Sequence, residues 1–171
     1  MVRGRRNPRY LGLARRLLTA RTQRKLTRMA LADLAAVGAP TVLYTETADR
    51  IPTVATIARL AAAMNVDAGW LAFGTGIEAT SAALQTSDGM GERLGALRTA
   101  RCLTKAALAR MVELSPSAYA KIENGGQTGV DTLEKLADAL RVSPAWLAFG
   151  VGPQELQTRR KVRTAQPDAR D

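Results

Sequence analysis

The apolar residues of this chain recur every three or four positions, which is the spacing of helices that bury one face. In the stretch 91–152, Leu94 and Leu97 share one face of a first expected helix. The inward faces of two further expected helices carry Leu108, Met111 and Val112, and then Leu133, Leu136 and Leu140. Aromatic residues make up only 4% of the chain, so Leu, Ala and Val must build the core, which also favours helices over sheets. The pattern predicts an all-α protein.

Residues that begin and end helices separate these apolar faces. Thr104 is suited to cap the second helix of the stretch, and Ser115 followed by Pro116 is a typical start for the third. Tyr119 and Ile122 would face inward, and the pair Gly125–Gly126 would end this helix. A second Ser-Pro pair, Ser143-Pro144, begins a short fifth helix, for which we expect core anchors at Trp146, Leu147 and Phe149 and a stop at Gly150.

The sequence WLAFG occurs twice, at 70–74 and 146–150, and the likeness extends far upstream. Residues 56–74 align with 132–150 at a spacing of 76. Further upstream the spacing is 77: residues 16–34 align with 93–111, and Glu46 aligns with Glu123. A loop between Glu46 and Thr53 would absorb the one-residue shift. We therefore expect a duplicated five-helix domain. The expected parts are a basic arm at 1–13, a degenerate domain at 14–76, a linker at 77–90, a second domain at 91–152 and a basic tail at 153–171.

The charge of the chain is concentrated at its two ends. The net charge is +10, yet residues 29–158 carry ten basic and thirteen acidic side chains. Residues 1–28 hold ten Arg or Lys and no acid, and the segment from Arg159 onward holds five basic and two acidic residues. Basic ends on a nearly neutral body favour a polyanionic partner such as nucleic acid.

Several functional classes are disfavoured by composition. The chain has no histidine, which removes histidine-based nucleophile pairs and the commonest general base and metal ligand. The single cysteine, Cys102, is expected to be a small buried residue. One cysteine fits a reducing cytoplasm. In that compartment a protein with a nucleic-acid partner would be associated with the nucleoid. No apolar run approaches the roughly 18 residues that span a membrane. We expect neither an enzyme nor a protein with a cofactor or metal site.

The stretch LTKAALARMVELSPSAYAKIENG, residues 103–125, resembles the helix-turn-helix of the Cro/C1-type repressors, the XRE family, throughout its length. The resemblance covers about 92–152 and, more loosely, 14–76. It implies two tandem five-helix, lambda-repressor-like domains and a sequence-specific regulator of transcription, a repressor by the family pattern, that binds double-stranded DNA. Such proteins read DNA as dimers, so we expect a homodimer or a single chain that imitates one.

The resemblance also implies roles for individual residues. The expected base contacts are Pro116, Ser117, Ala118 and Lys121. The expected contacts to the DNA backbone are Thr104, Lys105, Ser115, Asn124 and Arg101, together with Arg24, Lys25 and Arg28 of the first copy. The basic arm with Arg3, Arg5, Arg6 and Arg9 resembles arms that lie in a minor groove or along phosphates.

Both copies depart from the family pattern. In the second copy Glu113 stands in the turn where a left-handed backbone favours Gly, at a cost of about 1 kcal/mol. In the first copy the reading helix carries Thr41 and Tyr44, has no basic residue before Arg50 and lacks the Gly-Gly stop. Whether the first copy reads DNA, contacts only its backbone or serves as a scaffold is open at this point.

Two other functions stay open. The first copy could make the chain a protein-interaction module or an antitoxin-like adaptor, and this would be favoured if Thr41, Val42 and Tyr44 formed an exposed apolar patch. Alternatively, the basic ends could coat nucleic acid without regard to sequence. Binding would then depend steeply on salt, and replacement of Lys121 would have no effect beyond the loss of one charge.

Overall fold

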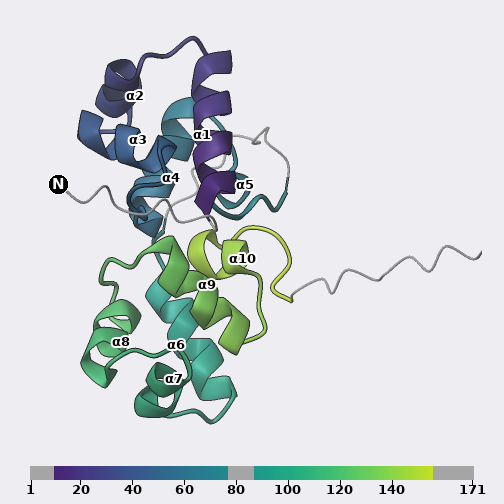
Figure 1. The fold of residues 1–171 in the computed structure, drawn as a ribbon. Helices are drawn as coiled ribbons and strands as arrows, with labels where there is room; N and C mark the ends of the chain where they lie inside the picture. The colour runs from purple at the N-terminus through teal and green to yellow at the C-terminus, as the bar shows by residue number, and fades with distance from the viewer. Residues whose placement is uncertain (1–9, 77–86, 156–171) are drawn as a thin grey trace, which may run out of the picture.

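The computed structural model describes residues 10–76 and 87–155, and this part of the chain is helical without named strands (Figure 1). The first five helices are α1 (Leu11–Gln23), α2 (Arg28–Leu34), α3 (Ala39–Glu46), α4 (Val54–Met64) and α5 (Ala68–Phe73). The next five are α6 (Met90–Ala100), α7 (Lys105–Met111), α8 (Pro116–Glu123), α9 (Val130–Ala139) and α10 (Pro144–Phe149). The expected all-α fold is confirmed.

The helices gather into two groups, which we name the N-terminal bundle (α1–α5) and the C-terminal bundle (α6–α10) (Figure 1). Corresponding helices have corresponding bounds: α3 and α8 begin 77 positions apart, at residues 39 and 116, and α5 and α10 begin 76 apart, at 68 and 144. The pairs α1·α3, α2·α3 and α4·α5 pack together in the first bundle, as α6·α8, α7·α8 and α9·α10 do in the second. That both bundles are domains of one family stays a prediction.

The expected caps and stops are present. Thr104 accepts a hydrogen bond from the backbone of Ala107, Ser115 caps α8 and Ser143 caps α10. α8 is followed by Gly125 with φ +87°, and α10 ends at Gly150 with φ +72°. Short polar side chains compete for the free N–H groups at helix starts, whereas glycine takes the left-handed conformation cheaply at helix ends.

Most of the expected core residues are buried, with three differences. Met111 is 55% exposed, because α7 ends there and its last turn extends beyond the core, whereas Leu108 and Val112 are buried. Trp146 is partly buried and packs at the edge of the core. Cys102 is exposed, which contradicts the expectation of a buried residue; it lies in the α6–α7 loop with φ +53°.

The structure also moves two expected boundaries. α1 begins at Leu11 and Leu13 is buried, so residues 10–13 belong to the N-terminal bundle and not to the arm. Met90, which we placed in the linker, is the first residue of α6 and is buried. Leu13 and Met90 are buried in the core because their side chains are apolar, and the charge pattern of the sequence did not indicate this.

The two bundles meet through their last helices. α5 packs against α10, and the rings of Phe73 and Phe149, one from each WLAFG sequence, lie 6.4 Å apart between centroids. The hydroxyl of Tyr10 donates to Glu134 across the same junction. Each WLAFG sequence therefore closes its own bundle and also contacts the other one. In Figure 1, α3 and α8 lie on the same side of the molecule, the left.

Candidate nucleic-acid interface

The helix pair α7–α8 has the geometry of a helix-turn-helix, with a short turn between two helices that pack on each other. Tyr119 and Ile122 fix α8 to the core, with exposed fractions of 0% and 6%. In the turn, the backbone N–H of Leu114 donates to Ala109 at 2.9 Å. Glu113 adopts φ +60°, the left-handed conformation expected at this position. One face of α8 is thus held rigidly while the opposite face is free.

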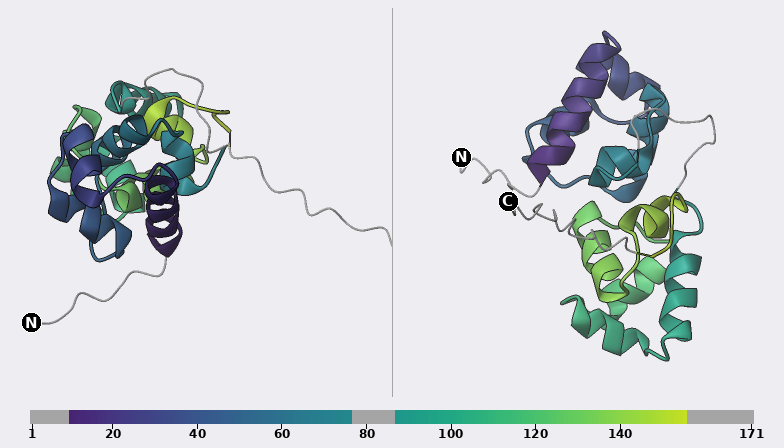
Figure 2. Two further views of the ribbon diagram at one scale, coloured as in Figure 1. Left: turned by 90° about the horizontal axis from the view of Figure 1, so that it is seen from above. Right: turned by 90° about the vertical axis from the view of Figure 1, so that its right-hand side faces the viewer.

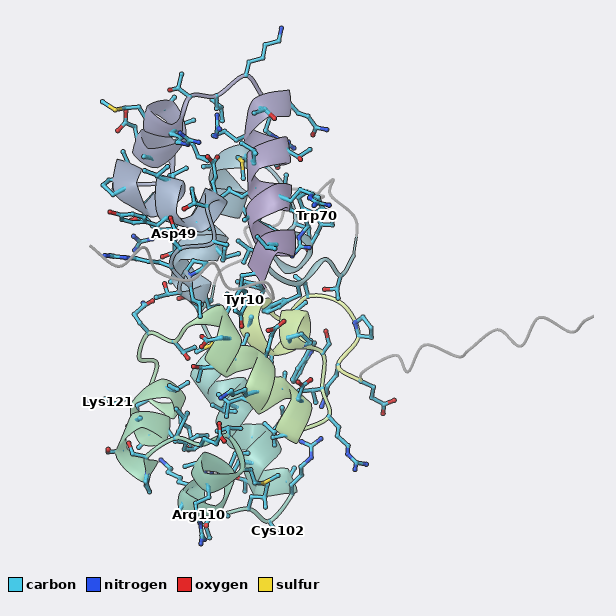
Figure 3. The ribbon with its side chains drawn as sticks, in the orientation of Figure 1. Tyr10, Asp49, Trp70, Cys102, Arg110 and Lys121 are labelled. Carbon is cyan, nitrogen blue, oxygen red and sulfur yellow. The ribbon has the colours of Figure 1, made fainter. Side chains whose placement is uncertain are left out.

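The predicted base-contacting residues lie on that free face. Pro116, Ser117 and Lys121 are exposed and Ala118 is partly exposed. Lys121 lies at the outer edge of the molecule on the side of α8 (Figure 3). Ser115 is fixed by its cap, since its Oγ accepts from the N–H of Ala118 at 3.1 Å and lies 3.1 Å from the Oγ of Ser117. The face offers one cation, hydroxyl groups and a methyl group.

The predicted backbone-contacting residues of the C-terminal bundle lie just after α6, at the start of α7 and at the two ends of α8. Thr104 and Asn124 are exposed at the start of α7 and at the end of α8, and Arg101 is exposed just after α6. The ammonium group of Lys105 lies 3.2 Å from Glu123 and is half exposed. Thr104 and Ser115 have structural roles as helix caps, and Lys105 has a structural role in an ion pair. The sequence pattern alone could not distinguish these structural roles from contact with DNA.

A cluster of charges joins the end of α8 to α6. The guanidinium group of Arg98 contacts both carboxylate oxygens of Glu123, at 2.9 and 3.1 Å, and donates to the carbonyl of Leu103 at 2.9 Å. The hydrogen bond from Arg98 lowers the pKa of Glu123 to about 2, and the same bond raises the pKa of Arg98. Burial raises the pKa of the neighbouring Tyr119 hydroxyl. This cluster sets the position of α8 against its bundle.

Lowering the pH should weaken the fold through Glu123. Its pKa in the folded chain lies below its ordinary value of 4.5, so its stabilising contribution is complete above pH 4.5 and declines as the pH falls toward 2. A shift of this size corresponds to roughly 3 kcal/mol. Urea unfolding between pH 6 and pH 2 measures it. The pH dependence should shrink in Glu123→Gln and persist in Glu113→Gln, because Glu113 is a highly exposed carboxylate; equal pH dependence in both variants would contradict the assignment.

The N-terminal bundle repeats this cluster at the aligned positions. Arg21 contacts Glu46 at 2.5 Å and donates to the carbonyl of Leu26 at 2.7 Å, while Arg28 contacts Glu46 at 2.6 Å. Arg24 donates to the backbone carbonyls of Met64 and Ala20. Of the three predicted phosphate-contacting residues in this bundle, Lys25 is exposed, Arg28 is half exposed and ion-paired, and Arg24 is partly buried against backbone.

The outer face of α3 differs from that of α8. Thr41 and Tyr44 are partly exposed, and Val42 is fully buried, so these three do not form an exposed apolar patch. The guanidinium carbon of Arg50 lies 4.6 Å from the centroid of the Tyr44 ring, which is the geometry of a cation–π contact. The loop after α3 therefore places the cationic side chain of Arg50 beside α3, which has no basic residue of its own. Sequence reasoning placed Arg50 beyond the helix and missed this contact, because no local spacing encodes the fold of the loop.

The sequence did not reveal the role of two further arginines, whose hydrogen bonds go to backbone carbonyls. Arg93 donates to the carbonyls of Leu147 and Ala148 at the end of α10, and Arg16 donates to those of Leu71 and Ala72 at the end of α5. Burial lowers the pKa of both. The two arginines occupy equivalent positions of the repeat, and this equivalence is the feature of the sequence that could have indicated a shared structural role. The predicted arm residues Arg3, Arg5, Arg6 and Arg9 lie outside the described residues.

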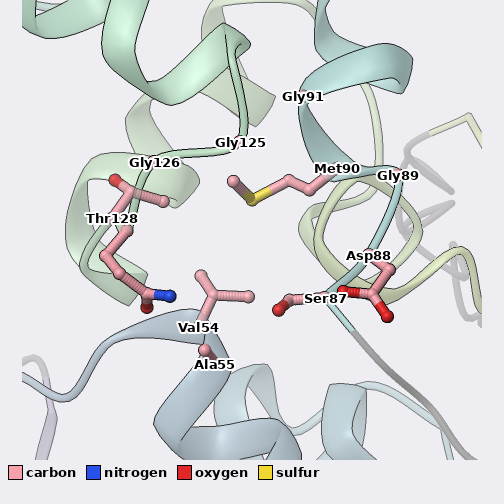
Figure 4. A pocket seen from close by; sticks show the side chains of 11 residues that line it. Val54, Ala55, Ser87, Asp88, Gly89, Met90, Gly91, Gly125, Gly126 and Thr128 are labelled. Carbon is pink, nitrogen blue, oxygen red and sulfur yellow. The ribbon is translucent and has the colours of Figure 1, made fainter.

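A hollow of about 220 Å³ lies beside the end of α8, at the junction of the two bundles (Figure 4). Gly125, Gly126 and Thr128 line one side of it, and Met90 and Val54 line others. Among the described residues of its lining, Asp88 is the charged one. A hollow walled mainly by backbone and small side chains does not specify a ligand chemistry.

The comparisons with known proteins agree with this geometry for one part of the chain. Residues 94–147, which run from α6 into α10, match the family described as "Helix-turn-helix". This match agrees with the helix-turn-helix geometry of α7 and α8, which lie within the matched segment. No solved structure gives a significant match to the chain. Within the described ranges 10–76 and 87–155, no helix has the length and apolar character needed to cross a membrane.

Proposed function

We propose that this protein is a sequence-specific regulator of transcription that inserts α8 into the major groove of double-stranded DNA. The observation that carries the proposal is the division of α8 into two faces. Tyr119 and Ile122 anchor one face in the core, and Ser117 and Lys121 are exposed on the other. A rigid helix with a polar outer face within a helix-turn-helix is the arrangement that reads base edges.

The chemistry of this face indicates which bases it would recognise. The ammonium group of Lys121 can donate to O6 and N7 of guanine, and the methyl group of Ala118 can contact the methyl group of thymine. The hydroxyl group of Ser117 can donate or accept and so fits several bases. Lys105, whose ammonium group pairs with Glu123 of α8, and Asn124 at the end of α8 would hold phosphates and set the orientation of the helix. Arg101, which is exposed just after α6, would be a further phosphate contact. The resemblance to Cro/C1-type proteins favours repression, by occupation of the site.

Selection of bound duplexes from a random DNA pool at near-physiological salt tests this function. We expect an enriched motif with the wild-type chain and about a 10- to 100-fold loss of affinity for that motif in Ser117→Ala/Lys121→Ala, because each good base contact is worth roughly 1–3 kcal/mol. Lys135→Ala is the matched control, since it removes one charge from α9 whose partner is the exposed Glu113 of the turn and not a residue of α8. An exposed pair of this kind contributes little to stability. Binding that shows no enriched motif and only weakens as salt rises would contradict the proposal.

The alternative role as a protein-interaction module is favoured by a different observation. Met29, Leu34 and Leu43 are exposed on α2 and α3 of the N-terminal bundle, with Met29 at 68% and Leu34 at 62%. Exposed apolar side chains on helices that pack together are a feature of protein contacts. Substitution of Met29 and Leu34 on α2 by Ser would separate the two roles: the regulator keeps its DNA affinity, whereas an adaptor loses its partner.

A further inference from the structure

The junction between the bundles joins equivalent positions of the repeat. Thr53 and Gly129, which are 76 residues apart, form an antiparallel bridge. Beside this bridge, the N–H of Val54 donates to the carbonyl of Thr128 at 2.9 Å, and the N–H of Val130 donates to the carbonyl of Pro52 at 3.2 Å. At the 76-residue spacing, Val130 is the counterpart of Val54, and Thr128 is the counterpart of Pro52. The two hydrogen bonds are thus reciprocal: each bundle donates from the same position of the repeat to the same position of the other bundle.

The helices α5 and α10 repeat this pattern. Gly69 lies against its counterpart Ala145 so closely that a Cβ atom on Gly69 would come within 2.7 Å of the Cβ atom of Ala145. Phe73 lies against its counterpart Phe149. When residues contact their own equivalents, and contacts are reciprocal, the two units are related by a twofold axis through those contacts. The chain therefore contains an internal approximate twofold axis that passes between α5 and α10.

This axis places α3 and α8 on the same face. In the right-hand view of Figure 2, α1 and α6 lie at opposite corners, as expected when the axis points toward the viewer. In Figure 1, which is turned by 90° from that view, α3 and α8 both lie on the left. Two reading helices on one side of a twofold axis can enter successive major grooves on one side of a DNA duplex.

The two helices that share this face are chemically different. Where α8 carries Ala118 and Lys121, α3 carries Thr41 and Tyr44. The cation beside these two residues is Arg50, whose guanidinium group lies over the Tyr44 ring. A twofold pair of identical helices reads two identical half-sites. A twofold pair of unlike helices needs two unlike half-sites.

We propose that one chain, acting alone, binds a bipartite and asymmetric DNA site, with α8 on one half-site and α3 on the other. The inference rests on the proposed function of α8. Thr41, Tyr44 and Arg50 are the residues that determine the second half-site. The two half-sites lie about one helical turn apart, roughly 34 Å. A second copy of the chain is not required, because the faces of α5 and α10 that would pair two subunits are already paired within one chain.

The test compares four proteins on one random DNA pool and then counts chains on the selected duplex by native mass spectrometry. The wild-type chain should select two unlike half-sites at a fixed spacing and bind them as one chain per duplex. Tyr44→Ala/Arg50→Ala should blur one half-site and Ser117→Ala/Lys121→Ala the other, each with at least a tenfold loss of affinity. Arg59→Ala is the control, since Arg59 is an exposed cation of the same bundle on α4.

A change in the DNA alone completes the test. Five extra base pairs between the half-sites turn one of them by about half a helical turn away from the protein face, so affinity should fall to that of a single half-site. A palindromic motif bound by two chains, or a single half-site that Tyr44→Ala/Arg50→Ala leaves unchanged, would overturn this inference and leave α8 as a reader. No enriched motif at all would overturn the proposed function as well.

Discussion

Arg98→Met is expected to lower the free energy of unfolding by about 3–5 kcal/mol, which is the usual cost of removing one partner from a buried ion pair. The side chains of Arg98 and Glu123 are 17% and 11% exposed. Without the guanidinium group, the cation that still faces the Glu123 carboxylate is Lys105, which is itself half exposed. The carbonyl of Leu103 loses the same donor. Methionine preserves most of the volume, so the loss reports the charge and its hydrogen bonds.

Urea unfolding followed by circular dichroism measures this loss, with Arg101→Met as the matched control. Arg101 is exposed three residues further along the chain, and its substitution should change stability by less than about 0.5 kcal/mol. DNA binding of Arg98→Met should also weaken, because Glu123 is the last residue of α8. Equal stability of the two variants would show that packing alone holds α8 in place.

The helices of this protein could be predicted from local signals. Thr104, Ser115 and Ser143 each cap the helix that the sequence assigned to them, and Gly150 ends α10 as expected. These features depend on a residue and its neighbours within one turn, so they are visible in the chain. The same reasoning failed for Met111 and Cys102, because exposure at a helix end depends on what packs there.

The contacts that position α3 and α8 could not be predicted in the same way. The alignment paired Glu46 with Glu123, yet it did not indicate that each carboxylate binds an arginine 25 residues earlier. The return of Arg50 to Tyr44 depends on the path of a loop. The pairing of α5 with α10 was hidden for another reason: a repeat shows that two units are alike, whereas their contact depends on surface shape.

Gly91→Ala is expected to lower the free energy of unfolding by about 3 kcal/mol, at the upper end of what overpacking costs. Gly91 lies in the first turn of α6, against the end of α8. A Cβ atom there would lie 2.3 Å from the carbonyl oxygen of Glu123 and 3.2 Å from the backbone nitrogen of Gly125. These are backbone atoms, which cannot rotate away as a side chain can, so α6 and the end of α8 must separate.

Gly95→Ala, one turn further along α6, is the matched control and should change stability in the opposite direction. Its added Cβ atom would make ordinary contacts of 3.5 Å with the side chain of Glu123. Alanine is favoured over glycine inside a helix by about 0.5–1 kcal/mol, so this variant should be slightly more stable than the wild type. Thermal and urea unfolding of the two single variants measure both signs. Similar stability of both would show that helix propensity outweighs the close approach of α6 to α8.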